Sequence, residues 1–243
     1  MLDLLKKIIY TGKVTEKFDA GTVPLRFRGE LSVSNSTCGN CNSCVTVCPV
    51  NAITVKSGSL AINHKACIFC GHCVEHCENQ HLAHTNNYKL AILDGVLSET
   101  EGEILRNKIH AVLGRSLHIR HVDVGSCNAC DFEMTALNNP IYDLQQYGID
   151  FVASPRHADM LMVTGVVTRN LTQALLMTYE ATPSPKLVMA VGACAASGHT
   201  FGSGYAIRGG VDAFIPVDIY IPGCPPRPQA LLYGLLLALD RIG

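Results

Sequence analysis

The sequence predicts two folded units, a small cysteine-rich module followed by a larger α/β domain whose sheet is mostly parallel. The first observation is that eight of the twelve cysteines fall between residues 38 and 77. A unit of that size has little room for an apolar core and needs another source of stability. The second observation is that residues 117–243 alternate short apolar runs with runs of helical spacing, which is typical of a parallel α/β sheet.

We expect four segments along the chain: an N-terminal arm over residues 1–30, the cysteine module over 31–85, a linker with a helix over 86–116, and the α/β domain over 117–243.

The arm and the linker are each expected to contain a helix. Apolar residues of the arm such as Leu5 and Ile9 have helical spacing, so this segment either packs on the protein's own core or docks on another subunit. In the linker, Ser98 and Glu101 have the spacing of a capping box, and Gly114 is placed to end the helix.

Composition excludes several classes of protein. Hydrophobic residues make up 48% of the chain and charged residues 16%, which indicates a folded core. A net charge of −1 gives no reason to expect nucleic acid as a partner. The N-terminus carries Asp3 early and does not resemble a signal peptide, so we expect a reducing cytoplasm, where clustered cysteines more often bind metal. No apolar run approaches the roughly 20 residues of a membrane helix, so membrane association is expected through partners.

In the α/β domain, the apolar pattern predicts strands over residues 117–124, 149–153, 159–165, 186–193 and 215–221, and helices over 171–179 and 228–242. A further helix is expected after Cys130, with its apolar residues at Phe132, Met134, Leu137, Ile141 and Leu144.

Four cysteines of this domain follow predicted strands. Cys127 and Cys130 form a Cys-x-x-Cys, which alone could be a redox dithiol, half of a zinc site or half of an iron–sulfur site. Cys194 and Cys224 each end another apolar run. Because ligands of open α/β sheets bind at the carboxyl ends of strands, we expect these four thiols to form one four-cysteine cluster site.

The remaining eight cysteines form a doubled pattern that resembles bacterial two-cluster [4Fe–4S] ferredoxins, which implies an α+β ferredoxin-like module. In such ferredoxins the fourth cysteine of each run binds the other cluster. The resemblance therefore implies one cluster on Cys38, Cys41, Cys44 and Cys77, and a second on Cys67, Cys70, Cys73 and Cys48. The three sets of four then use all twelve cysteines.

Zinc is the competing metal for this pattern, but zinc modules use pairs of cysteines rather than a triplet plus one. Glu78 stands after Cys77 where the ferredoxin pattern has proline. Five histidines also crowd the module, and we expect them at the surface or in hydrogen bonds near cluster sulfurs rather than as ligands: His64, His72, His76, His81 and His84.

Residues 117–243 resemble the small subunit of group 4 [NiFe] hydrogenases of the formate hydrogenlyase type, which are related to the 20 kDa subunit of respiratory complex I. The resemblance rests on the segments Gly125–Cys130, Ser154–Asp159, Thr164–Arg169, Gly192–Cys194 and Pro222–Pro226. Residues 1–90 separately resemble the ferredoxin-like subunit of the same complexes, through Met1–Lys6 and Phe27–Gly29. The chain thus resembles a fusion of two subunits.

This resemblance implies a flavodoxin-like fold and a proximal [4Fe–4S] cluster on Cys127, Cys130, Cys194 and Cys224, beside an active site in a large subunit. Complex I subunits have the first two of these ligands adjacent, so the Cys127-x-x-Cys130 spacing indicates the hydrogenase branch. Two further residues are candidates for roles near the cluster. Glu133 is either a helix N-terminal acid or part of a proton relay, and His199 is either close to the cluster or, as we favour, part of a turn.

The sequence therefore predicts an electron-transfer subunit with three [4Fe–4S] clusters and no catalytic residue of its own. Expected partners are a hydrogenase-type large subunit, membrane subunits of the complex, and a soluble ferredoxin or formate dehydrogenase-like donor. The expected location is the cytoplasmic face of the membrane. Two alternatives stay open: a subunit of a quinone-reducing, complex I-like enzyme or nickel-free hydrogenase relative, and a free ferredoxin-like carrier.

Overall fold

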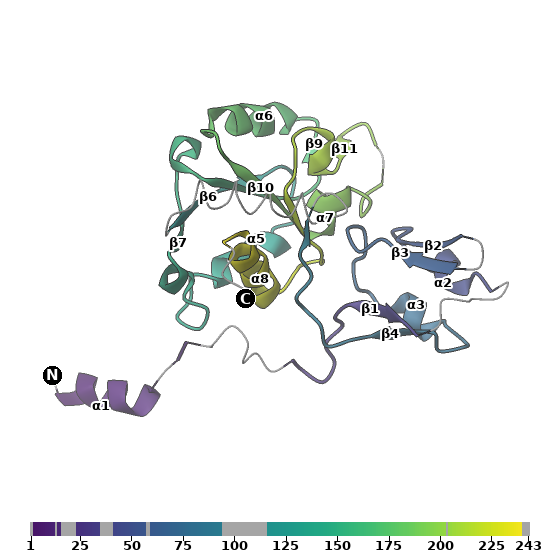
Figure 1. Ribbon diagram of the computed structural model, residues 1–243, viewed down its shortest axis with the longest axis horizontal. Helices are drawn as coiled ribbons and strands as arrows, with labels where there is room; N and C mark the ends of the chain where they lie inside the picture. Colours follow the sequence, from purple (N-terminus) through teal and green to yellow (C-terminus); the bar gives the residue numbers. More distant parts are fainter. Residues whose placement is uncertain are drawn as a thin grey trace.

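The computed structural model describes residues 2–12, 14–15, 23–34, 41–56, 59–93, 116–202 and 204–239. Figure 1 shows the α/β domain on one side, the cysteine module beside it, and helix α1 (Leu2–Thr11) apart from both. The linker helix expected after Ser98 and the ligand candidate Cys38 lie outside the described residues. In the ranges that are described, no helix is both long and apolar enough to cross a membrane.

The cysteine module consists of two small antiparallel sheets and two short helices. Its strand β1 (Leu31–Val33) pairs with β4 (Leu82–His84), and β2 (Ile53–Lys56) pairs with β3 (Ser59–Ile62). Helices α2 (Ser43–Thr46) and α3 (His72–Glu75) each contain one of the clustered cysteines. Cysteine side chains thus occupy much of the centre, and the buried residues form two small groups: Leu31, Cys44, Ile53, Leu60, Cys73 and Leu82, with Val50, Ala52 and Ala66 in the second.

The α/β domain is built on one six-stranded sheet with the strand order β5-β12-β10-β8-β6-β7. Five strands are parallel, and β5 pairs antiparallel with β12 at the edge. Taken in chain order, the parallel strands lie 2-1-3-4-5 across the sheet, which is the flavodoxin order. The strands are β5 (Ile92–Leu93), β6 (Leu117–Asp123), β7 (Ile149–Phe151), β8 (Met160–Thr164), β10 (Leu187–Val191) and β12 (Ile219–Ile221).

Helices cover both faces of this sheet, so its central strands are apolar on both sides. Met160 and Met162 of β8 pack in the core beneath α5 (Ala129–Ala136) and α8 (Pro228–Ala238). Leu161 and Val163 point to the opposite core, which includes residues of α6 (Thr172–Ala181) and α7 (Gly192–Ser197). A separate ribbon pairs β9 (Val167–Thr168) with β11 (Ile207–Gly209), and single 3-10 turns lie at Leu144–Tyr147, Pro155–His157 and Val211–Ala213.

The predicted alternation of strands and helices is confirmed, with corrections to several ends. The last strand covers only Ile219–Ile221 instead of residues 215–221. The helix expected after Cys130 ends at Ala136, since Pro140 disfavours helical geometry at the residue before it. The Asn139 side chain instead accepts hydrogen bonds from the first two backbone N–H groups that follow Pro140.

Two parts of the chain differ from the predicted packing. Phe132 and Ile141, expected on the apolar side of one helix, are 75% and 39% exposed. The interpretation of the arm as a helix on the protein's own core is wrong for the described side chains of α1, since Leu5 and Ile9 are 53% and 78% exposed. The predicted linker also contributes β5 to the sheet, so the α/β unit begins before residue 117.

Candidate cluster sites

Four cysteines converge at the carboxyl edge of the sheet. Cys127 and Cys130 follow β6, Cys194 lies in the first turn of α7 directly after β10, and Cys224 follows β12. Burial and the nearby thiols of Cys194, Cys224 and Cys127 raise the pKa of Cys130 to about 12. The sulfurs are therefore close enough to influence one another. We name this set the third site.

Glycine makes room for the sulfur of Cys130. Gly192 has φ +84°, and a Cβ atom on it would lie 2.7 Å from the Cys130 Sγ. The next residue, Ala193, donates its N–H to the carbonyl of Gly223 at 2.8 Å. This bond joins the turn that carries Cys194 to the loop that carries Cys224. A side chain at Gly192 would displace the sulfur and strain the backbone.

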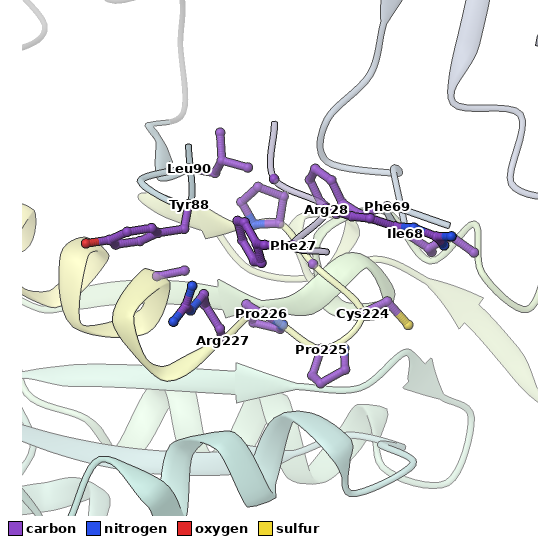
Figure 2. A pocket seen from close by; sticks show the side chains of 14 residues that line it. Phe27, Arg28, Ile68, Phe69, Tyr88, Leu90, Cys224, Pro225, Pro226 and Arg227 are labelled. Carbon is purple, nitrogen blue, oxygen red and sulfur yellow. The ribbon is translucent and has the colours of Figure 1, made fainter. Parts of the chain in front are cut away.

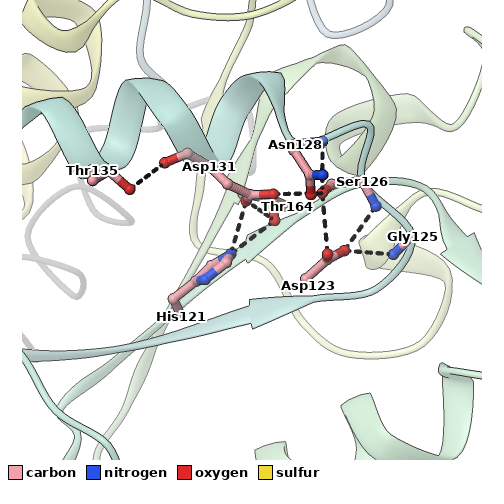
Figure 3. A network of polar contacts seen from close by, with 8 residues as sticks. All are labelled: His121, Asp123, Gly125, Ser126, Asn128, Asp131, Thr135 and Thr164. Carbon is pink, nitrogen blue, oxygen red and sulfur yellow. Dashed lines mark hydrogen bonds and ion pairs between the residues drawn. The ribbon is translucent and has the colours of Figure 1, made fainter.

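A polar network holds the Cys127-x-x-Cys130 turn on the sheet (Figure 3). Asp123, the last residue of β6, accepts from the backbone N–H groups of Gly125 and Ser126 at 2.8 and 2.7 Å. Burial alone would raise the pKa of Asp123, but these bonds and the Ser126 hydroxyl lower it. The Ser126 hydroxyl also lies 2.5 Å from Asp131, the residue after Cys130. Both ends of the turn are thus fixed to charged acceptors.

The same carboxylate of Asp131 reaches the neighbouring strand. Thr164 of β8 is fully buried and donates to Asp131 Oδ1 at 2.7 Å. His121 of β6 brings Nε2 to 3.1 Å from that oxygen and 2.9 Å from the Thr164 hydroxyl. Burial lowers the pKa of His121, against the opposing effect of Asp131. This network was missed from sequence; the register that sets Asp123 opposite Thr164 is what brings its members together.

Other polar groups lie near the third site. The Thr200 hydroxyl is buried beside Cys194, and its interaction with that thiol partly offsets the burial that raises the pKa of Cys194. Burial raises the pKa of Glu133, and Arg227 opposes the rise. His199 is exposed, and its N–H donates to Ser197 in the turn after α7.

Four other cysteines line one cavity in the module, which we name the second site. They are the set expected from the crossed ferredoxin pattern: Cys48, Cys67, Cys70 and Cys73. Burial and the thiols of Cys67, Cys70 and Cys48 raise the pKa of Cys73 to about 11. Backbone N–H groups of Ala52 and Phe69 donate to the sulfurs of Cys48 and Cys67 at 3.2 and 3.4 Å.

The first site of the module is described in part, because Cys38 lies outside the described residues. Cys44 is buried in the module core, against which Cys77 packs. The N–H of His81 donates to Cys77 Sγ at 3.3 Å. The Ser43 hydroxyl lies 3.2 Å from the Cys41 sulfur, and this contact lowers the pKa of Cys41.

These donor sets fit iron–sulfur clusters. The second and third sites offer four thiols each, which is the ligand set of a [4Fe–4S] cluster. Backbone N–H groups already point at Cys48, Cys67 and Cys77, and such bonds are available to thiolate ligands of a cluster. Among the described residues, no three His, Cys, Asp or Glu side chains are arranged to hold a single metal ion.

One pocket lies between the loop that carries Cys67 and Cys70 of the second site and the Cys224 loop of the third site (Figure 2). Ile68 and Phe69, which lie between Cys67 and Cys70, line it together with Cys224. In the same pocket the guanidinium of Arg227 lies 5.0 Å from the ring of Phe27 and 5.1 Å from that of Tyr88. The ammonium of Lys65 sits 3.4 Å from the ring centroid of Tyr220 in β12. Lys65 thus joins the module to the sheet, while Arg227 and β5 hold the segments that flank the module against the α/β domain.

Comparison with known proteins agrees with this architecture. Residues 127–238 match the family described as NADH ubiquinone oxidoreductase, 20 Kd subunit, and residues 30–78 match the 4Fe-4S dicluster domain. The probable membrane-bound hydrogenase subunit mbhJ of Pyrococcus furiosus is 47% identical over 130 residues, which cover 54% of this chain and 78% of that protein. The chain belongs to the 20 Kd subunit family.

Two further relatives of this 20 Kd family member come from different complexes. Formate hydrogenlyase subunit 7 of Escherichia coli is 46% identical over 128 residues, which cover 53% of this chain and half (50%) of that protein. A subunit of the NADH-quinone oxidoreductase of Geotalea uraniireducens is 49% identical over 114 residues, which cover 47% of this chain and 66% of that protein. The predicted fusion of a two-cluster ferredoxin-like unit with a 20 Kd-type unit is confirmed, and iron–sulfur clusters are its cofactors.

Proposed function

We propose that this chain is the electron-transfer subunit of a membrane-associated group 4 [NiFe] hydrogenase-type complex. The observation that carries the proposal is the third site, a four-thiol set at a sheet edge whose Cys224 loop shares a pocket with the loop between Cys67 and Cys70 of the second site. When bound, three [4Fe–4S] clusters would supply one-electron transfer through the chain. The proposed ligand sets are Cys38, Cys41, Cys44 and Cys77; Cys67, Cys70, Cys73 and Cys48; and Cys127, Cys130, Cys194 and Cys224.

The residues between the sites support a fixed order. Ile68 and Phe69 place the second site next to the Cys224 loop. The first site takes three ligands from the other cysteine run and Cys77 from this one, and we propose that the second site lies between it and the third site. Two cation–π contacts support this arrangement, that of Arg227 with Phe27 in the pocket and that of Lys65 of the module with Tyr220 of β12. The protein's own role is thus to hold three sites in a row.

A partner subunit supplies the catalytic centre in this proposal. Cys127 and Cys224 are exposed, and Phe132, one turn into α5, is 75% exposed. An exposed ligand set bordered by an aromatic side chain is suited to being covered by another protein. Glu133 lies beside Phe132 as either a helix N-terminal acid or a member of a proton relay. Burial raises the pKa of its carboxyl, which favours the relay, because a helix N-terminus stabilises the charged form and would lower that pKa.

The chain docks peripherally on its complex in this proposal, at the cytoplasmic face of the membrane. The arm over residues 1–30 is the proposed docking segment, because Leu4, Leu5, Ile8 and Ile9 of α1 are all more than half exposed. A large subunit and membrane subunits are the proposed partners. A soluble ferredoxin or a formate dehydrogenase-like protein is the proposed electron donor to the module.

Quinone reduction is the second candidate function. It is supported by the Geotalea uraniireducens relative, which is named as a subunit of an NADH-quinone oxidoreductase. The hydrogenase assignment is favoured by the Cys127-x-x-Cys130 spacing and by the names of the Pyrococcus furiosus and Escherichia coli relatives. A free carrier is disfavoured because a carrier has no need of the exposed Cys127 and Phe132 surface.

The test is to purify the tagged chain with its partners from the membrane fraction under anaerobic conditions. We expect a nickel-containing large subunit and hydrogen evolution with a reduced low-potential dye. A complex with Cys224→Ser should keep nickel and lose electron delivery, which makes it the matched control. A nickel-free complex that is inert to hydrogen and reduces quinone would establish the second candidate instead.

A further inference from the structure

His84 ends strand β4 with its imidazole fixed on one side. Its Nδ1 lies 3.0 Å from the carbonyl oxygen of Gly29. A carbonyl only accepts hydrogen bonds, so Nδ1 carries the hydrogen and donates. Gly29 is itself held, because its N–H donates to the carbonyl of Thr85 at 3.1 Å. The orientation of the ring is therefore set by the backbone that precedes β1 and not by the solvent.

The other ring nitrogen of His84 is buried and has no hydrogen-bond partner within the described residues. The side chain lines the second-site cavity, whose walls also include Leu31 and Ile53. Apart from His84, the side chains there are apolar or belong to the clustered cysteines: Leu31, Cys48, Val50, Ala52, Ile53, Cys67, Ile68, Phe69, Cys70 and Cys73. A buried polar atom without a partner is costly, and this one lies at the site where a cluster would bring sulfur acceptors.

We propose that His84 Nε2–H donates a hydrogen bond to a sulfur of the cluster at the second site and thereby raises the reduction potential of that cluster. This inference rests on the proposed assignment of Cys48, Cys67, Cys70 and Cys73. The two ring nitrogens then face different acceptors, Nδ1 the carbonyl of Gly29 and Nε2 the cluster. Reduction adds an electron to the cluster, and an N–H donor stabilises the more negative, reduced state. His84 is a positioning and tuning residue, not a ligand.

The effect would favour an electron at the site nearest the α/β domain. Ile68 and Phe69 of the second-site loop line a pocket together with Cys224, so a raised potential at the second site favours reduction beside the third site. The first site has other sulfur contacts, from the Ser43 hydroxyl and the His81 N–H. The two clusters of the module would therefore differ in potential although their cysteine spacings are alike.

Three substitutions separate the two hydrogen bonds of His84. His84→Leu removes both of them. His84→Asn can keep a donor toward Gly29 and removes the atom that reaches the cavity, while His84→Gln can place a neutral N–H near the Nε2 position. The matched control is His76→Gln, since His76 is an exposed histidine of the same module whose ring contacts the His72 carbonyl.

The experiment is a redox titration of the full-length protein followed by EPR. For His84→Leu and His84→Asn, we expect the reduced-to-oxidised ratio of one module cluster to fall about tenfold at a fixed potential, equivalent to about 59 mV for one electron. His84→Gln should recover part of the loss. His76→Gln, and the other module cluster in every variant, should keep wild-type potentials. Wild-type potentials in His84→Leu, or in His84→Asn alone, would overturn the proposal.

A second measurement needs no variant. Wild-type protein labelled with ¹⁵N-histidine should show, by pulsed EPR, a weak nitrogen coupling to one reduced module cluster, and its absence would overturn the hydrogen bond. If both module clusters are present, neither shows this coupling and no His84 variant shifts a reduction potential, the role of His84 is overturned and the ligand assignment stands. A wild-type protein without a cluster at the second site would overturn the ligand assignment, and this inference with it.

Discussion

The cysteine module and the α/β domain use cysteine sites for different purposes. The α/β domain has an apolar core on each face of its sheet; its four cysteines lie at the edge and are not members of either core, although Cys130 packs against one of them. In the module, Cys44 and Cys73 belong to the small core itself. A cluster at the third site is therefore carried by a fold that stands without it, whereas the module needs its clusters to fold.

The largest expected effect is from Cys44→Ser. Loss of this buried ligand should remove the clusters of the module and unfold residues 31–85, because the remaining apolar core is too small to hold the segment. Limited proteolysis should then cut the module and leave the α/β domain intact, while EPR loses both module signals. Thr46→Ala, at an exposed position two residues away, should retain both. A Cys44→Ser protein that keeps both module signals would contradict the ligand assignment.

Cys224→Ser should have a narrower effect. Cys224 is exposed and lies outside the apolar cores, so its loss should cost the third cluster while the fold and the two module clusters survive. EPR should lose one signal of three, and electron delivery to the partner should fall to background. Protease cleavage within the α/β domain of this variant would show that the domain depends on its cluster as the module does.

Cluster removal should make the α/β domain sensitive to alkali. In the cluster-free domain, burial and neighbouring thiols raise the pKa of Cys130 from 9.0 to about 12. Because the folded pKa is raised, the stability that this thiol contributes is fully present below the unfolded pKa and is lost as pH rises from about 9 toward 12. Urea unfolding of the cluster-free protein should show its midpoint falling over this range. A Cys130→Ala variant should fall less, and equal slopes would show that Cys130 is not the cause.

Thr164→Val is expected to have the smallest of these effects. It removes a buried hydroxyl that donates to Asp131 and lies 2.9 Å from His121 Nε2. The loss should lower the free energy of unfolding of the α/β domain by about 1–3 kcal/mol, measured by urea denaturation. Thr178→Val is the control, since that hydroxyl bonds only a carbonyl of its own helix. No difference between the two variants would show that the network around Asp131 does not hold the turn.

Sequence patterns predicted the α/β fold better than the details of its site. Both faces of the sheet are covered, so strands such as Met160–Thr164 read as unbroken apolar runs and could be predicted. The cysteines could be grouped because parallel strands end at one edge. The two-residue strand β5 is too short to give a pattern, and the contact of Thr164 with Asp131 depends on strand register and helix placement. The buried nitrogen of His84 likewise depends on the pairing of β1 with β4.

The central claim, three clusters held by three sets of four cysteines, is tested most directly by metal analysis. Protein purified anaerobically should contain about twelve iron and twelve acid-labile sulfide per chain, with three reducible signals by EPR. Cys224→Ser should lower both values to about eight. Wild-type protein with iron near eight, or with stoichiometric zinc, would contradict the three-cluster account.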